Sequence, residues 1–97
     1  VPAGRPRRVA RDPSGERVVE VGDKGISIGS DENADIRIEG MFVAAMHARI
    51  VIENGRVVLH KLAGLRPVKV GGKAVREIEL KDNDEIQIGN ESFVFHE

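Results

Sequence analysis

The stretch ARIVIENGRVVLH, residues 48 to 60, decides the fold class of this chain. Apolar and polar side chains alternate on both sides of Asn54 and Gly55, as they do in strands with one buried face. Asn-Gly is the dipeptide preferred in two-residue type I′ turns, because both central positions need φ > 0. The stretch therefore predicts an antiparallel β-hairpin with an opposite-charge pair beside its turn. The predicted cross-strand pairs are Ile50 with Leu59, Ile52 with Val57 and Glu53 with Arg56.

Outside this hairpin, a short unit of apolar, variable and apolar residues recurs, mostly with β-branched side chains. The units lie at residues 26–28, 36–38, 50–52, 68–70, 78–80, 86–88 and 93–95. Turn-forming sequences separate them: Pro13-Ser14-Gly15, Asn54-Gly55, Gly71-Gly72, Asp82-Asn83-Asp84 and Gly89-Asn90. A helix is arguable only for residues 41–46, which are too few to be stable without a cap. Many short strands separated by turns predict an all-β fold, an antiparallel β-sandwich.

Length and composition fit one small domain. The 97 residues leave little room for a second core, and the only aromatics are three Phe, so Val, Ile and Leu must fill the interior. We expect residues 9–97 to form this domain, with a first edge strand near Val9. Residues 1–8 contain three arginines and are expected to be a basic linker, with a nucleic-acid-binding arm as the alternative. Because the chain begins at Val1 rather than Met, we expect it to be part of a longer protein.

The overall charge and the cysteine count exclude several kinds of partner. A formal net charge of -1 gives no reason to expect nucleic acid or a membrane surface as the partner. Cysteine is absent, which excludes disulfides and thiolate metal ligands and fits a cytoplasmic location. No apolar run approaches the ~18 residues of a membrane span, so direct membrane insertion is not expected. The domain would equally suit the cytoplasmic part of a larger, membrane-attached protein.

Candidate catalytic and metal-binding residues are few. The histidines His47, His60 and His96 are not spaced as a ligand set, and His47 with His60 alone would make a weak metal site. No glycine-rich loop leads into a helix, so there is no phosphate cradle of the nucleotide-binding type. We expect neither an enzyme nor a metal nor a cofactor, but a binding site on loops at one end of the sandwich. The candidate loops are residues 29–34, 39–46 and 63–67.

The pairs Ile28-Gly29, Asp35-Ile36 and His47-Ala48, with Ile86, Ile88 and Gly89 further on, lie in three motifs that resemble the forkhead-associated (FHA) domain, a phosphothreonine-reading β-sandwich. In IGSDENADIRIEGMFVAAMHARI, residues 28 to 50, the matching positions are Ile28-Gly29, Asp35-Ile36, Val43 and His47-Ala48. In LHKLAGLRPVKVGGKAV, residues 59 to 75, they are Leu59, Leu62, Val70 and Gly72. In LKDNDEIQIG, residues 80 to 89, they are Leu80, Asp84, Ile86, Ile88 and Gly89. The resemblance covers about Val18 to Phe95 and implies a sandwich of the FHA (SMAD/FHA-like) type with about eleven strands.

The positions that would contact phosphate depart from the family pattern. The resemblance places the family's phosphate-binding arginine at Ser30, its phosphate-binding serine at Ala44, and a common arginine at Ala45. The asparagine that holds the bound peptide corresponds to Arg66, and Pro67 follows in place of glycine. Hydrogen bonds to charged groups contribute about 1.5–3 kcal/mol each, so losing the guanidinium and one hydroxyl removes roughly 3–6 kcal/mol. Phosphate binding through Arg66 is the alternative, although Pro67 restricts Arg66 to extended backbone angles.

Other residues of these loops are expected to be structural or to contact a protein. The resemblance implies structural roles for Gly29 and His47, with His47 linking the recognition loops by hydrogen bonds. An exposed apolar patch marks a protein contact. The candidates for such a patch are Met41, Phe42 and Leu65. The alternative is that Phe42 and Met46 fold inward and fill space in the core.

These observations predict a degenerate FHA domain that acts as a phosphothreonine-independent protein-interaction module, in signalling or as a scaffold, within a larger protein. The predicted partner-binding positions are Ser30, Ala44, Ala45, Leu65, Arg66 and Pro67. One alternative is a structural or oligomerisation domain, such as a homodimer, in a scaffold or secretion-type assembly. A second alternative is a weak phosphopeptide reader that uses Arg66.

Overall fold

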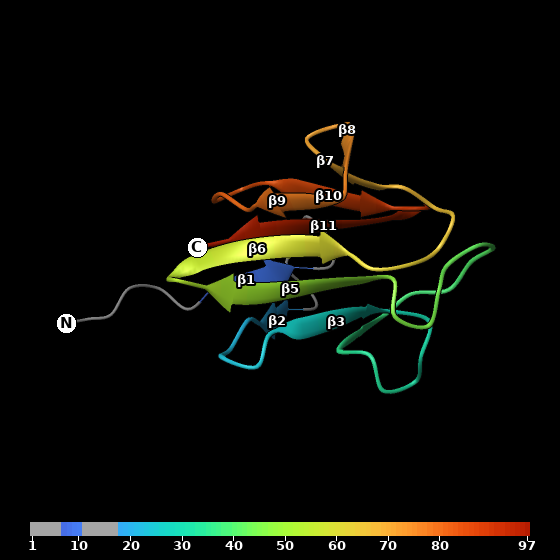
Figure 1. The fold of residues 1–97 in the computed structure, drawn as a ribbon, viewed down its shortest axis with the longest axis horizontal. Coiled ribbons are helices and arrows are strands. Elements are labelled where there is room, and N and C mark those ends of the chain that lie inside the picture. Colours follow the sequence, from blue (N-terminus) through green and yellow to red (C-terminus); the bar gives the residue numbers. More distant parts are fainter. Residues whose placement is uncertain (1–6, 11–17) are drawn as a thin grey trace.

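The computed structural model describes residues 7–10 and 18–97, which form two β-sheets packed on a common core (Figure 1). This described part contains eleven strands and no helix, which confirms the predicted all-β sandwich. The strands are β1 (Arg8–Ala10), β2 (Val18–Glu20), β3 (Ile26–Gly29), β4 (Ile36–Arg37), β5 (Ala48–Glu53), β6 (Arg56–Lys61), β7 (Val68–Val70), β8 (Lys73–Val75), β9 (Glu77–Glu79), β10 (Glu85–Ile88) and β11 (Glu91–His96). Residues 1–6 of the predicted linker and the predicted turn at residues 13–15 lie outside the described residues.

Strands that are far apart in sequence lie side by side in both sheets. One sheet has the order β2-β1-β11-β10-β7-β8 and the other β4-β3-β5-β6-β9. The pair β3 and β4 is parallel, and the remaining pairs within the described residues are antiparallel. The prediction that the strand near Val9 forms an edge is wrong, because β2 pairs with β1 on the side away from β11. The sequence prediction missed strand β2, although Val19-Glu20-Val21 has the same alternation as the other units.

The hairpin of β5 and β6 has the predicted register, with Ile50 opposite Leu59, Ile52 opposite Val57 and Glu53 opposite Arg56. Asn54 and Gly55 have φ values of 53° and 78°, which confirms the predicted turn chemistry. Glu53 and Arg56, beside the turn, each form an ion pair with a different residue. Arg56 lies 3.9 Å from a carboxylate oxygen of Glu79, and Glu53 lies 3.0 Å from Nε2 of His60. This happens because β9 pairs with β6 and brings Glu79 alongside.

The core lies between the sheets and consists mainly of aliphatic side chains, as predicted from the composition. Phe93 and Phe95 of β11 are fully buried at its centre, and both sheets contribute neighbours. Within the described residues, His47 is the one buried side chain that is polar or charged. The buried aliphatic residues of the cluster are Val9, Val21, Ile26, Ile28, Ile36, Ile38, Ala48, Ile50, Val57, Leu59, Val68, Val70, Leu80, Ile86 and Ile88.

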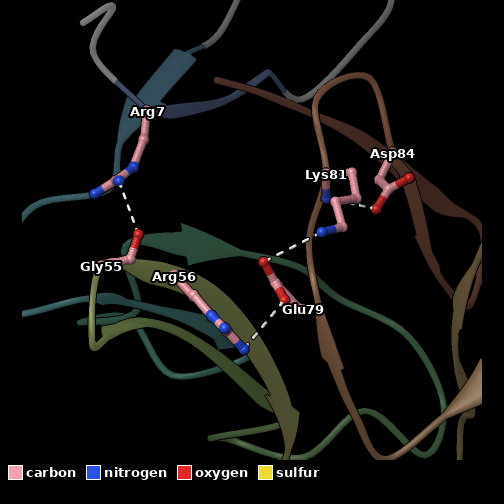
Figure 2. Close-up of polar contacts among 6 residues, drawn as sticks. All are labelled: Arg7, Gly55, Arg56, Glu79, Lys81 and Asp84. Carbon is pink, nitrogen blue, oxygen red and sulfur yellow. Dashed lines mark hydrogen bonds and ion pairs between the residues drawn. The ribbon is translucent and has the colours of Figure 1, made fainter.

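Exposed polar contacts lie at the end that carries the β5–β6 turn, and the one between Arg7 and Gly55 joins the two sheets (Figure 2). A guanidinium nitrogen of Arg7, which precedes β1, donates to the carbonyl oxygen of Gly55 at 3.0 Å. Glu79 accepts from Lys81 at 3.3 Å and lies near Arg56. Exposed pairs of this kind contribute at most about 1 kcal/mol each. The candidate loops lie at the opposite end of the sandwich, where these contacts do not reach (Figure 1).

Candidate functional site

Three loops meet at one end of the sandwich (Figure 1). They connect β3 to β4, β4 to β5 and β6 to β7, and together they include the loops proposed from the sequence. Backbone hydrogen bonds fasten them to one another. The N–H of Ser30 donates to the carbonyl oxygen of Ala44 at 3.0 Å, and the N–H of Leu65 donates to the carbonyl oxygen of Phe42 at 3.1 Å. The β4–β5 loop is therefore the middle loop, bonded to both of the others.

Gly29, the last residue of β3, lets the first two loops touch. It is buried, and the backbone of Ala44 and Ala45 passes so close that a Cβ on Gly29 would overlap the carbonyl oxygen of Ala45. The N–H of Asp31 also donates to this carbonyl oxygen, at 3.3 Å. Any larger residue at position 29 would push the middle loop away and break these bonds.

His47 links the middle loop to the β6–β7 loop through both ring nitrogens. The N–H of Ala44 donates to Nδ1 at 3.1 Å, and Nε2 donates to the carbonyl oxygen of Arg66 at 2.8 Å. These partners require a neutral ring that carries its proton on Nε2. Burial lowers the pKa of His47 below its usual 6.5; the bond to Arg66 acts in the opposite direction, and the charge of Lys61 adds to the lowering. The ring is fully buried and fully bonded, so it holds the loops and is not placed for chemistry.

Gly64 completes this arrangement, and sequence reasoning missed it. Its φ is 95°, and a Cβ there would overlap the His47 ring. The residue must therefore be glycine on two grounds, because side chains disfavour this backbone region and no room exists beside the imidazole. Nothing in the sequence signals this need except the glycine itself.

The positions to which the sequence resemblance assigns the family's phosphate contacts lie together at this end. Ser30 and Ala44 are adjacent and half-buried, and Ala45 is exposed. The half-buried Arg66 donates its Nε to the carbonyl oxygen of Met41 at 3.2 Å. Arg66 is therefore already bonded to the middle loop, while Pro67 beside it is exposed.

Arg37 of β4 is a second cation at this end that sequence reasoning missed. Its Nε donates to the carbonyl oxygen of Ser30 at 3.4 Å, and its terminal nitrogen lies 3.2 Å from a carboxylate oxygen of Glu39. The parallel pairing of β3 with β4 sets Arg37 opposite Gly29 and creates this proximity. Sequence spacing alone does not reveal that pairing.

A sequence model of the FHA domain matches residues 26–89. The chain belongs to the FHA-domain family. FHA domains are protein–protein interaction modules that generally bind phosphothreonine peptides, and they are not enzymes. The predicted family and its sandwich fold are confirmed.

Solved structures of other FHA domains have the same fold. The FHA domain of CT664 from Chlamydia trachomatis is 21% identical, with a TM-score of 0.82 over 96% of this chain and 98% of that one. The FhaA FHA domain complexed with the intracellular domain of Rv3910 is 21% identical, with a TM-score of 0.82 over 93% and 99%. EmbR from Mycobacterium tuberculosis, in complex with a low-affinity phosphopeptide, is 26% identical, with a TM-score of 0.83 over 94% of this chain and 24% of EmbR. A comparison with curated protein sequences gives no match.

The loop end of this FHA domain exposes large apolar side chains. Met41, Phe42 and Leu65 are 73%, 61% and 77% exposed, and we call these three residues the apolar patch. Met46 is also exposed, so the alternative that Phe42 and Met46 fold into the core is wrong. Val43 is half-buried and packs against the core in their place. Phe42 has φ = 67°, a left-handed conformation that is costly for a bulky residue. The backbone thus holds Phe42 outward at an energetic cost, which is common at functional sites.

Acidic residues dominate the first two loops of this end. Residues 29–46 contain four acids, Asp31, Glu32, Asp35 and Glu39, against the single cation Arg37. All four acids are exposed, and Glu39 pairs with Arg37. A bound phosphate would bring about two further negative charges into this field. The first two loops therefore carry a formal charge of -3, whereas the β6–β7 loop carries the cation Arg66.

Within residues 7–10 and 18–97, no group of three or more His, Cys, Asp or Glu side chains is arranged to hold a metal ion. His60 lies on the outer face of β6, where Glu53 and Glu77 bond its two nitrogens at 3.0 and 3.1 Å. His47 is buried and points to the other loops, so the two histidines do not form a pair. In the same part of the chain, no helix has the length and hydropathy needed to cross a membrane.

Proposed function

We propose that this FHA domain binds a protein partner through the apolar patch and does not require phosphothreonine. The observation that carries the proposal is the exposure of Met41, Phe42 and Leu65 between loops whose phosphate-contact positions hold Ser30 and Ala44. Exposed apolar side chains that are gathered in one place are typical of protein contacts. Methionine and phenylalanine also contribute large contact areas with adaptable shape.

The patch is ordered before any partner arrives. The carbonyl oxygen of Phe42 accepts from the N–H groups of Leu65 and Arg66 at 3.1 and 3.4 Å, and that of Met41 accepts from the Arg66 side chain. These bonds fix the two halves of the patch relative to each other. Binding to a preordered surface loses less conformational entropy, which favours affinity from a small contact area.

The cations near the site support a phosphate-independent mode. Arg66 is bonded to Met41, and Arg37 is paired with Glu39, so a phosphate would have to displace existing partners. Among the FHA relatives, EmbR was solved with a low-affinity phosphopeptide and FhaA with an intracellular protein domain. We infer that the present domain, like these relatives, contacts a protein, and that it has lost the strong phosphate contacts.

Isothermal titration with a phosphothreonine peptide library tests the proposal. We expect no phosphate-dependent binding in the native chain. A variant that carries Ser30→Arg together with Ala44→Ser is the matched positive control, because the two positions adjoin across the loops. We expect that variant to gain about a hundredfold in affinity for phosphothreonine peptides, as two restored charged hydrogen bonds would give. Micromolar, phosphate-dependent binding by the native chain would overturn the proposal.

Self-association is the second candidate, because the patch that binds a foreign protein would also suit a second copy of this chain. Sedimentation velocity at rising concentration separates the two candidates. A dimer that disappears in the Phe42→Asp variant would identify the second copy as the partner. If the chain is a monomer at every concentration, a foreign protein remains as the candidate partner. If weak phosphopeptide binding is found and is lost in Arg66→Ala, the residual-reader alternative holds instead.

A further inference from the structure

We propose that the β7–β8 hairpin of this domain, with the groove beside it, binds an acidic, unphosphorylated segment of a protein partner. The segment of residues 61–76 contains five cations and no acid. Its cations are Lys61, Arg66, Lys69, Lys73 and Arg76. The whole chain has 15 Lys and Arg against 16 Asp and Glu, so the remaining sequence has 10 cations against 16 acids. A near-neutral total therefore conceals one strongly basic segment.

Four of these cations, which we call the basic strip, have no side-chain partner among residues 7–10 and 18–97. Arg66 bonds to Met41, but the side chains of the other four make no ion pair or hydrogen bond with any residue in the described part of the chain. Lys69, Lys73 and Arg76 are exposed, and Lys61 is half-buried. The basic strip consists of Lys61, Lys69, Lys73 and Arg76. Like charges held together repel one another, so a ligand that carries several negative charges would relieve this repulsion.

A groove of about 220 Å³ lies at the hairpin, and its lining combines apolar side chains with two cations of the strip. Lys61 and Arg76 stand at it, together with apolar residues of β7, β8 and the loop before them. A backbone hydrogen bond of 2.8 Å from Lys61 to Arg76 joins the end of β6 to the chain after β8 and fixes these two cations near each other. The apolar residues of the groove are Pro67, Val68, Ala74 and Val75.

The composition of this surface selects the class of ligand. An apolar lining with cations beside it suits a peptide whose apolar side chain enters the groove while its carboxylates reach the lysines. Nucleic acid is disfavoured because single strands stack their bases on exposed aromatic rings. Of the three Phe in the chain, Phe93 and Phe95 are buried, and Phe42 lies in the apolar patch. An acidic protein segment is therefore the occupant that the surface favours.

The hairpin is separate from the acidic loops. Figure 1 shows β7 and β8 standing out from one side of the sandwich, with the β3–β4 loop on the other side. A partner bound across the apolar patch would therefore have acidic residues of the domain on one side and basic residues, near Pro67, on the other. This second contact would orient the partner, since its acidic segment can lie on one side of the patch only.

Titration of the ¹⁵N-labelled 97-residue chain with a synthetic 12-residue peptide tests the proposal. The peptide contains Asp and Glu with one central Leu, and its Gln and Asn analogue is the neutral control. We expect chemical-shift changes at the backbone amides of the hairpin and of Lys61 and Arg76, and a dissociation constant that rises with ionic strength. Shift changes confined to residues 41–46, or equal binding of the neutral analogue, would overturn the proposal.

Charge variants locate the contact and separate it from the proposed function. Lys69→Glu with Lys73→Glu should weaken the peptide by about tenfold, because each reversal replaces an attraction with a repulsion. The milder variant Lys69→Gln with Lys73→Gln removes the charges without reversing them and controls for a folding defect. Lys24 is an exposed lysine in the β2–β3 turn, so Lys24→Glu is the matched control and should leave the affinity for the peptide unchanged. Phe42→Asp should leave peptide binding intact even if the apolar patch has no partner. Tighter binding of a phosphothreonine peptide or of a dT12 oligonucleotide at the hairpin would replace the acidic protein segment with that ligand.

Discussion

At the scale of single residues, His47 should make the stability of the domain depend on pH. Burial lowers the pKa of His47 in the folded state below the unfolded value of 6.5. The contribution of neutral His47 to the free energy of unfolding is therefore fully present above pH 6.5. It is lost as the pH falls through the pKa of His47 in the folded state, because the unfolded chain binds a proton that the folded chain does not. The loss is at most about 1.4 kcal/mol per pH unit.

Urea unfolding of the native chain and of His47→Gln, each at pH 7.5 and 5.5, measures this contribution. Carboxylates are common to both chains, so the difference between their pH slopes isolates the imidazole. We expect His47→Gln to be less stable at pH 7.5, by about 1–3 kcal/mol, because two loop contacts lose a partner, and to have the flatter slope. Equal slopes would show that the ring does not stay neutral on folding.

Phe42 should lower the stability of the domain while its side chain contributes to partner binding. Its φ of 67° costs roughly 1–2 kcal/mol for an ordinary residue, and asparagine tolerates this conformation better. We expect Phe42→Asn to raise the free energy of unfolding by about 0.5–1 kcal/mol while it weakens partner binding. The substitution Leu65→Asn, at an exposed patch residue for which no positive φ is found, is the control and should weaken binding without added stability. A less stable Phe42→Asn would mean that the ring contributes packing that outweighs its backbone cost.

At the scale of elements, the β6–β7 loop depends on the close approach of Gly64 to His47. Gly64→Ala meets both a positive φ of 95° and the imidazole ring, whereas Gly72→Ala meets a positive φ of 84° with nothing within 4 Å. We expect Gly72→Ala to cost about 1 kcal/mol from backbone strain alone. Gly64→Ala should cost about 2–4 kcal/mol, because displacement of the ring adds an overpacking term. Thermal unfolding of the two variants measures both, and equal losses would mean that the loop relaxes freely.

Elements that depend on local chemistry were predictable from the sequence. The β5–β6 hairpin follows from alternation and from an Asn-Gly turn, both of which act within a dozen residues. Pairings of distant strands were not predictable. Strand β2 pairs with β1, and β4 has two residues whose parallel pairing with β3 has no sequence signature.

The candidate site divides in the same way. The gathering of the three loops at one end could be predicted from residue types, because short motifs at fixed spacing position them. The roles of Gly64 and Arg37 could not, because each depends on a side chain or strand that only the folded chain brings near. The left-handed backbone of Phe42 was likewise hidden, since nothing in its residue type favours that conformation.

At the scale of the whole molecule, the interior position of β1 predicts where the domain can be shortened. Val9 is fully buried and β1 pairs with both β2 and β11, whereas the described contacts begin at Arg7. Removal of residues 1–6 leaves Arg7 and β1 in place and is the control for the longer deletion. Removal of residues 1–10 should prevent cooperative folding, because β11 and β2 both lose a neighbour. Thermal unfolding of the two shortened chains, followed by circular dichroism, tests this prediction. A folded 11–97 chain would show that β1 is dispensable.

The close packing of Gly29, His47 and Gly64 also gives the loop end a use in protein engineering. These residues fix the path of the three loops through backbone and buried contacts, while Asp31, Ala45 and Leu65 of the same loops are exposed and point outward. A library that randomises the outward positions and keeps the three fixed residues should therefore remain largely folded. The domain would serve as a cysteine-free scaffold from which binders to chosen proteins are selected, in the manner of antibody loops on their framework.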